Sequence, residues 1–355
     1  MTRDRTILVR NVYYMLAYAF RTLHQCEYAD VAAEDFDNVH DLLAAILARG
    51  LARQIKQGLY REYVPLSGEL SVLRGRLDIM GTVRVRMARR PVVACEYDEL
   101  TEDNVVNRVV KAACLTLARQ GSVKLERREE LLRQARHLSG VGDVDLRTVQ
   151  WRSIRLTREN QSYRLLLGVC ELLAKGLLQT EEDGSVRLAE FVSDERMHWL
   201  YEHFILEYYR QEHPELSASA PQVPWALDDG QGSMLPVMQT DITLRQGRRT
   251  LIIDAKYYSH NTQASYSAHT IHSANLYQIF AYVKNEQERL GPRHDVSGML
   301  LYARTDEAVQ PEGSYLMSGN RIEVQTLDLG QEFRGIAAQL DDIALRRLTG
   351  YACNE

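Results

Sequence analysis

Apolar residues recur with helical spacing along much of the first half of the chain. The stretch Val9–Phe20 contains Asn11, a residue type favoured at helix N-caps, followed by Val12, Leu16 and Ala19 at helical spacing. This pattern predicts a helix that packs against apolar surroundings. The same spacing predicts four further helices, over His40–Lys56, Asn104–Ala118, Val123–His137 and Tyr163–Leu178.

Between these helices, shorter stretches either alternate polar and apolar residues or lack the helical spacing of apolar residues. Two short strands are predicted over Tyr60–Val64 and Gly75–Met80. Thr82–Arg86 alternates valine with arginine, which predicts a strand with one basic face. That face is a candidate contact for phosphates or an acidic partner, or else a solvated strand face. The run Glu96–Asp103 predicts an acidic turn.

The run Gln179–Gly184 interrupts the periodic pattern and predicts a domain boundary, with domains at 1–185 and 186–355. The second domain is expected to begin with a helix from Glu195 to about Glu212. The rest of its pattern predicts a strand near Val223–Leu227, a hairpin over Thr240–Tyr258, a polar loop over Ser259–Ser273, a helix over Asn275–Lys284, strands over Val296–Tyr302 and Arg321–Leu327, and a closing helix from Gln331. This order predicts an α/β fold with a mixed sheet, following an α+β first domain.

The predicted hairpin places two carboxylates opposite each other. Its turn falls on Gly247-Arg248, and glycine in the first turn position suits a type II′ turn. Asp241 and Asp254 are then equally far from the turn and become cross-strand partners on one face. Lys256 follows two residues later and points to the same face.

Two carboxylates held this close need a cation between them, or one must remain protonated. Mg²⁺ prefers carboxylate oxygens and keeps several of its waters, so it suits the pair Asp241 and Asp254. Lys256 could then orient a water or stabilise charge that develops on a phosphate. The alternative is a surface hairpin in which Asp254 and Lys256 form a solvated ion pair.

Glu202 is a candidate third acid for this site. It shares a helix face with Trp199, Ile205 and Leu206, so it points toward apolar surroundings and needs a partner. The alternative is a peripheral glutamate paired with a nearby arginine. His269 and His272 have a spacing that sometimes serves metals, but a mobile loop that bears histidines is the favoured interpretation.

The composition is that of an ordinary globular protein of 355 residues, with 45% hydrophobic and 26% charged residues. No apolar run approaches the roughly 20 residues of a membrane span, and the N-terminus lacks the pattern of a signal peptide. The five cysteines are scattered, which favours a reducing cytoplasm over a disulfide framework or a zinc site.

Charge is unevenly distributed along the chain. Residues 1–190 carry a net charge of +3, whereas the remainder, which holds the carboxylate hairpin, carries −8. The second half is therefore not a generally basic surface for nucleic acid. If it acts on DNA, the phosphate contacts must come from a local patch, a second copy or a partner.

Taken together, these residues resemble the PD-(D/E)xK nuclease superfamily. The resemblance rests on Glu202, Asp241, the Asp254-x-Lys256 pair and the later Gln278-x-x-x-Tyr282, although Thr240 replaces the proline that gives the superfamily its name. Nearly the whole chain is similar to the McrC family, the nuclease subunits of McrBC restriction systems. The stretches that carry this similarity are VRNVYYMLAYAF, GRLDI, DELTEDNVVNRVVK, TDITL, LIIDAKYY and NLYQIFAY.

The resemblance implies a PD-(D/E)xK endonuclease domain over 186–355 that cleaves DNA carrying 5-methylcytosine. It implies a Mg²⁺ cofactor held by Asp241, Asp254 and Ala255, with Lys256, Glu202 and Gln278 completing the catalytic set. It also implies an AAA+ GTPase partner resembling McrB, a hexamer that the first domain docks on and stimulates. The chain has no G-x-x-x-x-G-K-[ST] loop of its own, so GTP is expected on the partner.

Three functions therefore compete. The favoured one is the Mg²⁺-dependent nuclease subunit of a GTP-driven complex that cuts methylated double-stranded DNA. The others are an adaptor that activates an AAA+ NTPase without cutting, and a free-standing nuclease of DNA repair or recombination. Self-association of the nuclease domains is a further expectation, because cutting both strands usually takes two active sites.

Overall fold

A computed structural model describes residues 3–4, 7–22, 34, 36, 38–120, 122–177, 194–258, 263–265 and 268–349. The chain divides into two compact units, one of Met1–Leu42 with Leu188–Glu355 and one of Leu43–Arg187. The predicted boundary within Gln179–Gly184 lies outside the described residues. Among the described helices, none has both the length and the apolar composition that a membrane span requires.

The first unit is built on a five-stranded mixed sheet in the order β13-β14-β12-β9-β8. The central strand β12 runs parallel to both β9 and β14, while the outer strands β8 and β13 run antiparallel to their neighbours. The strands are β8 (Ile242–Gln246), β9 (Arg249–Lys256), β12 (Asp295–Ala303), β13 (Gly313–Met317) and β14 (Asn320–Leu327). The predicted mixed sheet is confirmed, with β13 as an edge strand that the sequence did not predict.

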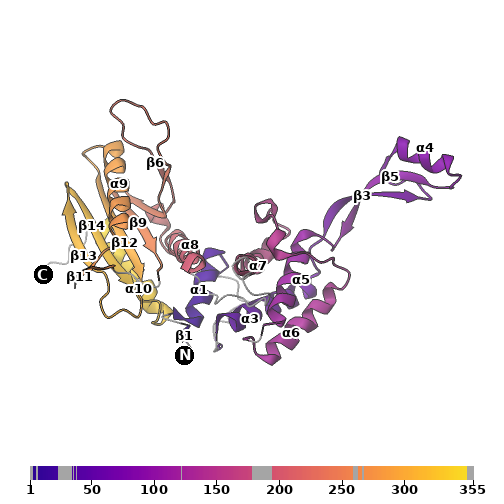
Figure 1. Ribbon diagram of the computed structural model, residues 1–355, viewed down its shortest axis with the longest axis horizontal. Coiled ribbons are helices and arrows are strands. Elements are labelled where there is room, and N and C mark those ends of the chain that lie inside the picture. Colours follow the sequence, from indigo (N-terminus) through magenta and orange to yellow (C-terminus); the bar gives the residue numbers. More distant parts are fainter. Residues whose placement is uncertain are drawn as a thin grey trace. The chain divides into compact units, whose positions relative to one another are not determined.

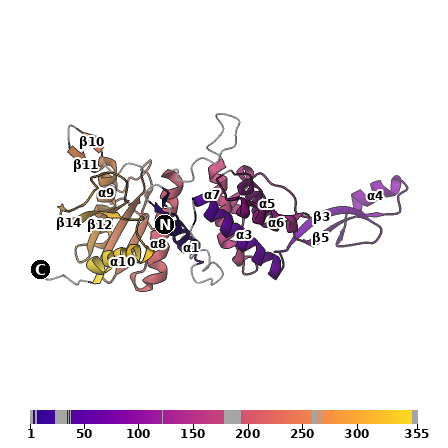
Figure 2. The ribbon, with the colours of Figure 1, turned by 90° about the horizontal axis from the view of Figure 1, so that it is seen from below.

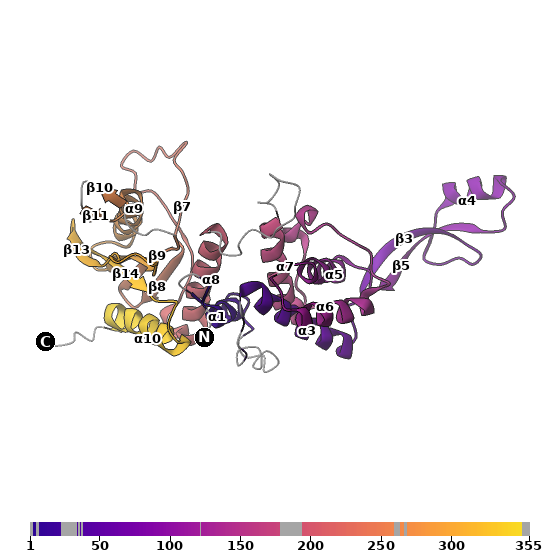
Figure 3. The same ribbon diagram turned by 60° about the horizontal axis from the view of Figure 1, so that its bottom comes forward.

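Helices cover both faces of this sheet. In Figure 3, α9 (Ser273–Leu290) lies on one side of the strands and α10 (Phe333–Ala344) on the other. The long helix α8 (Asp194–Glu212) contacts β8 and β9. All three helices were predicted from the sequence. The observed α9 is longer than predicted, because it continues to Leu290.

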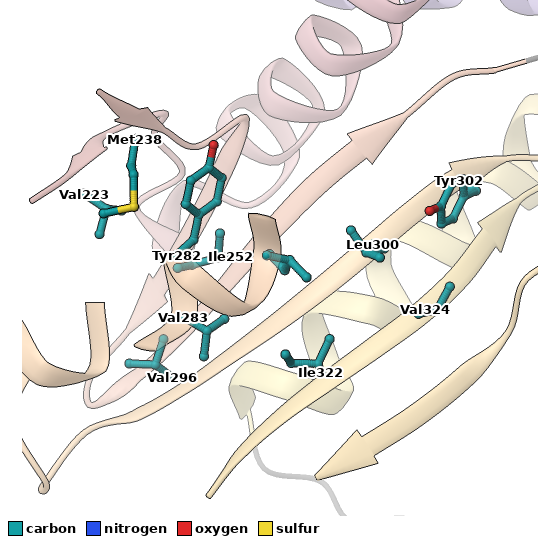
Figure 4. Close-up of a cluster of buried hydrophobic side chains, with 11 residues drawn as sticks. Val223, Met238, Ile252, Tyr282, Val283, Val296, Leu300, Tyr302, Ile322 and Val324 are labelled. Carbon is teal, nitrogen blue, oxygen red and sulfur yellow. The ribbon is translucent and has the colours of Figure 1, made fainter. Parts of the chain in front are cut away.

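The core between the sheet and α9 is apolar and closely packed. Figure 4 shows Tyr282 and Val283 of α9 facing the strands that carry Ile252 and Leu300. Gly298 of β12 allows a close approach of this helix, because an added Cβ would lie 2.7 Å from a Val283 methyl carbon. Burial of each large aliphatic side chain here contributes about 1.5–3 kcal/mol to the free energy of unfolding.

The N-terminal helix α1 (Val9–Ala19) belongs to the unit that holds the five-stranded sheet. The sequence predicted it in the other part of the chain, the N-terminal domain over 1–185. The helix packs on α8, and Asn11 donates hydrogen bonds to the carbonyls of Leu329 and Gln331 at 2.8 and 2.7 Å. The ring of Tyr14 stacks on Phe333 of α10 at 4.3 Å. The predicted division at 185/186 therefore differs from the observed one for the first 42 residues. Local periodicity predicted the helix, but it carries no information about which core that helix joins.

The second unit combines a helical bundle with a β arm. Helix α5 (Val105–Ala118) packs on α6 (Leu125–Ala135) and α7 (Arg164–Leu177), and α3 (Val39–Gln57) carries a run of fully buried residues. The hydroxyl of the buried Tyr163 donates to Asn107 on α5 and accepts from the backbone N–H of Tyr60. This hydrogen-bond network fixes the base of the arm to the bundle.

The arm consists of a three-stranded sheet in the order β3-β5-β4, with one helix at its outer end (Figures 1 and 2). Strands β3 (Glu62–Leu70) and β5 (Val93–Thr101) pair antiparallel over their full lengths. The two-residue strand β4 (Arg76–Leu77) adds to β5, and α4 (Ile79–Met87) follows it. Gly75 makes the turn before β4 with φ of +67°, where a Cβ would collide with the Glu96 carbonyl.

Two predictions in the arm were wrong. The alternating segment Thr82–Arg86 lies in α4 and is not a strand, because Asp78 caps the helix by accepting from the Gly81 N–H at 3.0 Å. The predicted acidic turn Glu96–Asp103 is mostly strand β5. Its acidic side chains are compatible with a strand because arginines neutralise several of them, as in the pairs of Arg74 with Glu99 and Arg61 with Glu102.

Several short elements complete the two units. The predicted polar loop after the site contains a small hairpin, and the strand predicted near Val223–Leu227 is only two residues long. These elements are β1 (Arg3–Asp4), β2 (Ile7–Leu8), β6 (Gln222–Val223), β7 (Met238–Gln239), β10 (Gln263–Ser265) and β11 (Ala268–Thr270).

The junction between α8 and α10 predicts a pH-dependent stability. His213 lies 2.8 Å from Asp341 and 3.1 Å from Glu215, and Asp341 also accepts from the Tyr208 hydroxyl. Burial lowers the pKa of His213, but the two carboxylates outweigh it and raise that pKa above its ordinary value. The stabilisation is therefore complete below the unfolded-state pKa and disappears as the pH rises through the folded-state pKa.

We expect wild type to exceed His213→Gln in unfolding free energy near pH 5.5, and this difference to shrink by pH 8.5. Because Asp341 and Glu215 are about half exposed, water screens the pairs and limits the difference to about 1 kcal/mol. Urea denaturation at a series of pH values measures it. A difference that grows with pH would contradict the charged pairing.

Candidate active site

The candidate active site lies at the C-terminal end of β9, an interior strand between β8 and β12. Every second residue of β9 points to the same face of the sheet. The face that α9 covers carries Ile252, Asp254 and Lys256. Asp254 is 1% exposed and Lys256 is 6% exposed, so the alternative of a solvated surface ion pair is wrong. Both side chains are buried because β9 has neighbours on both sides and a helix above it.

Asp241 meets Asp254 as the hairpin register predicts. Strands β8 and β9 pair Ile242 with Ile253, so Asp241 lies opposite Asp254. Of the two turn residues only Gly247 has a positive φ, +59°, as the first position of a type II′ turn requires. The Asp241 carboxylate is held in place by the backbone N–H of Ala255, which donates to its Oδ2 at 2.9 Å.

Lys256 links the carboxylates to α9. Its ammonium lies 2.8 Å from Oδ2 of Asp254 and donates to Oε1 of Gln278 at 3.2 Å. The amide of Gln278 donates in turn to the hydroxyl of Tyr282 at 2.9 Å. The structure therefore brings Gln278 to the site, and Tyr282 fixes the orientation of its amide.

The electrostatics of the site are those of crowded, desolvated acids. Burial first, and then the carboxylates of Asp254 and Glu202, raise the pKa of Asp241 to about 8. Burial also raises the pKa of Asp254, against the lowering effect of Lys256. Burial lowers the pKa of Lys256, but the two aspartates reverse this and raise it above its ordinary value. The ammonium is thus a fixed positive charge that only partly balances three acids.

Glu202 projects from α8 near these groups, close enough to raise the pKa values of both aspartates. Its side chain is 23% exposed, and its Oε1 lies 2.7 Å from Nε2 of His198, one turn earlier on the helix. The alternative that Glu202 pairs with an arginine is therefore wrong, because its partner is this histidine. The i, i+4 spacing could have indicated the pair from the sequence, but we did not predict it.

The carboxylate of Asp254 suits a hard cation, because its oxygens lack well-placed hydrogen-bond donors within the described part of the chain. Neither oxygen of Asp254 accepts a hydrogen bond of good geometry from the described residues, although Oδ2 is paired with Lys256. A buried carboxylate in this condition favours an additional positive charge. Within the described residues, however, no three His, Cys, Asp or Glu side chains gather closely enough to hold a metal by themselves. Asp241 and Asp254 are the two side chains placed to bind one, and the main chain at Ala255 lies between them.

The comparisons with known proteins decide the family. The family described as McrBC 5-methylcytosine restriction system component matches residues 3–303 of this chain. The chain belongs to this family. The family predicted from the sequence is thereby confirmed, and the protein is a component of a McrBC-type restriction system.

Two relatives place the family match in context. The type IV methyl-directed restriction enzyme EcoKMcrBC of Escherichia coli K12 is 28% identical over 341 residues, covering 95% of this chain and 97% of the relative. A chain from a tetradecameric assembly of Thermococcus gammatolerans McrB AAA+ hexamers with bound McrC has a similar fold. The TM-score is 0.52 at 19% identity, covering 94% of this chain and 76% of that chain.

Proposed function

We propose that this chain is the Mg²⁺-dependent endonuclease subunit of a McrBC-type complex and cleaves methylated double-stranded DNA. One observation carries the proposal: Asp241, which is partly exposed, meets the buried Asp254 and Lys256 at one end of an interior strand. Two opposed acids beside a buried ammonium lower the free energy of unfolding. A protein that served only as an adaptor would gain nothing from them. The arrangement therefore favours a nuclease over an adaptor that has lost its chemistry.

The residues of the site have distinct proposed tasks. Asp241 and Asp254 would hold the cation together with the main chain at Ala255, and the cation would supply Lewis-acid stabilisation of the phosphate. Lys256 would orient a water or stabilise negative charge on a phosphate oxygen, while Gln278 fixes the ammonium. Glu202 would contribute a third carboxylate from α8.

A McrB-like AAA+ GTPase is the proposed partner, and the arm is the surface that fits it best. Large apolar side chains on and beside α4 are exposed, as shown by Met80 at 74% and Met87 at 81%. Arg84, Arg86 and Arg89 of the same region form no ion pair with the described part of the chain. An apolar patch with free arginines is typical of a protein interface whose partner has an acidic rim. A docking arm also favours a complex over a free-standing repair nuclease.

The test of the proposed function mixes the chain with its candidate GTPase partner, GTP, Mg²⁺ and DNA. We expect cleavage of DNA that carries 5-methylcytosine and none of unmethylated DNA, and no cleavage when partner, GTP or Mg²⁺ is omitted. Cleavage of both DNAs by the chain alone would favour the repair nuclease. Stimulated GTP hydrolysis without any cleavage would favour the adaptor.

A second experiment addresses the arm. The triple variant Ile79→Ser, Met80→Ser, Met87→Ser is expected to bind the GTPase at least about 10-fold more weakly, because exposed apolar anchors dominate interface energetics. Association is measured by light scattering or calorimetry, and GTP hydrolysis by phosphate release. The matched control is Leu125→Ser with Leu132→Ser on α6, which are exposed apolar residues of the same unit away from the arm. Equal binding by the triple variant and wild type would remove the arm from the interface.

A further inference from the structure

The second unit carries a short basic segment that the proposed function does not use. Residues 147–164 contain five arginines, no lysine and one carboxylate, that of Glu159. The chain as a whole has a net charge of −5, so the protein does not attract a phosphate backbone in general. A contact with DNA outside the active site therefore needs a local concentration of positive charge, and this segment supplies one.

The three central arginines of the segment, Arg152, Arg155 and Arg158, are exposed and unpaired. None of them forms an ion pair or a side-chain hydrogen bond within the described part of the chain, and the nearby Glu159 pairs with none of them. Arg147 differs, because its guanidinium lies 2.8 Å from the carboxylate of Asp145. Like charges gathered without counter-charges repel one another, which favours the binding of a polyanion.

Hydrogen bonds within the segment fix the backbone that carries these arginines. The side-chain oxygen of the buried Asn160 accepts from the N–H of Thr157 at 2.7 Å, and its amide donates to the carbonyl of Arg155 at 3.1 Å. The hydroxyl of Ser153 donates to the carbonyl of Gln150 at 2.7 Å. The segment thus has a defined backbone before any ligand binds, which lowers the entropic cost of binding.

The surroundings of these arginines favour nucleic acid over a protein partner. Their exposed neighbours include the polar residues Ser153, Thr157 and Gln161. Leu156, at 40%, is the one large apolar side chain that is exposed between residues 147 and 164, whereas the α4 end of the arm exposes several. Protein–DNA interfaces are more polar and more positively charged than protein–protein interfaces, and hydroxyls and amides beside arginines commonly contact phosphates.

The spacing of the arginines also suits a DNA strand. Successive arginines are three residues apart, and Ile154 between the first two is extended, with φ of −75° and ψ of 105°. Three residues of extended chain span at most about 10 Å, which corresponds to about three nucleotides at a rise of about 3.4 Å each. Three long side chains at this spacing can therefore reach different phosphates of one strand.

We propose that Arg152, Arg155 and Arg158 form a phosphate-binding surface that holds double-stranded DNA independently of its sequence and methylation. The proposal rests on the proposed function in one respect, since it takes DNA as the substrate. Residues 191–355, which hold the active site, carry a net charge of −8 and do not attract DNA by themselves. The arginines supply this attraction from the other unit and take no part in the cleavage chemistry.

The test measures binding of the full chain to an unmethylated duplex of about 30 base pairs by fluorescence anisotropy, without partner, GTP or divalent cation. The triple variant Arg152→Gln, Arg155→Gln, Arg158→Gln is expected to bind at least about 10-fold more weakly at about 50 mM salt. The slope of log K against log salt should fall by about 2–3, because each phosphate contact contributes about 0.9. The corresponding triple lysine variant keeps the charges and should remain within about 3-fold of wild type.

The matched control is a second triple variant in the same unit, Arg119→Gln, Arg133→Gln, Arg136→Gln. These arginines lie at the end of α5 and on α6, are exposed, and form no ion pair with another described residue. The control changes the net charge by the same amount, so it reports the effect of overall charge alone. It should bind DNA within about 3-fold of wild type.

The outcomes distinguish this surface from the proposed function. Equal weakening by both triple variants, an unchanged salt slope in the first, or no binding by wild type at low salt would overturn the surface and leave the nuclease proposal standing. Weaker association of the first variant with the GTPase, together with unchanged DNA binding, would assign the arginines to the protein partner and also overturn it. If DNA binding behaves as expected but wild type cuts no methylated DNA with partner, GTP and Mg²⁺, the proposed function fails and the surface is upheld.

Discussion

Asp254→Ala is expected to lower single-turnover DNA cleavage by at least about 1000-fold. Asp254 is the most buried acid of the site, and neither of its oxygens accepts a well-formed hydrogen bond from the described residues. If it holds the cation, its loss removes Lewis-acid stabilisation worth several kcal/mol, and about 4 kcal/mol corresponds to about 1000-fold in rate. The measurement uses saturating partner, GTP, Mg²⁺ and methylated DNA.

Folding and partner binding supply the controls for this variant. Stimulation of GTP hydrolysis should be unchanged, because the arm lies in the other unit. Asp342→Ala, an exposed aspartate of α10, is the matched substitution and should cut normally. Asp254→Ala leaves Lys256 buried without its carboxylate, so some loss of thermal stability is expected. Asp241→Asn leaves the pair of Asp254 and Lys256 in place, and the asparagine oxygen can still accept from the Ala255 N–H. A folded Asp254→Ala variant that cuts at the wild-type rate would eliminate the site.

Lys256→Arg is expected to lose at least about 100-fold in cleavage rate, nearly as much as Lys256→Ala. Lys256 is 6% exposed, and its ammonium fits between Asp254 and Gln278, at 2.8 and 3.2 Å. A guanidinium is planar and larger, so it keeps the charge but cannot place it as a compact point beside a phosphate oxygen. If Lys256 only balanced the charge of Asp254, arginine would preserve most of the activity.

Single-turnover cleavage across a Mg²⁺ titration distinguishes these two roles. The half-saturating Mg²⁺ concentration should change little, because Lys256 is not a proposed ligand. Lys284→Arg on α9 is the matched control, since the Lys284 ammonium donates to the Ser318 carbonyl and to Asn320, away from the site. An arginine variant that cuts within a few-fold of wild type would leave Lys256 as a charge-balancing residue.

The sequence by itself determined the features whose causes are local. Gly247-Arg248 predicted the turn, the turn predicted the register, and the register brought Asp241 opposite Asp254. Each step depends on residues less than about 15 positions apart, where backbone geometry leaves few choices. Periodicity likewise predicted α5, α8, α9 and the strands β12 and β14. The roles of these residues in cleavage remain predictions.

Only the tertiary structure decided which elements meet. The order of the sheet buries Asp254 by placing β12 beside β9, and α1 joins the unit of the site although it is distant in sequence. The alternating segment Thr82–Arg86 could have formed a strand, but a cap at Asp78 made it a helix at the outer end of the arm. Glu202 could have paired with an arginine, and its neighbour is His198. Periodicity reports which face of an element is apolar, whereas the partner of that face depends on packing between distant segments, which no local pattern encodes.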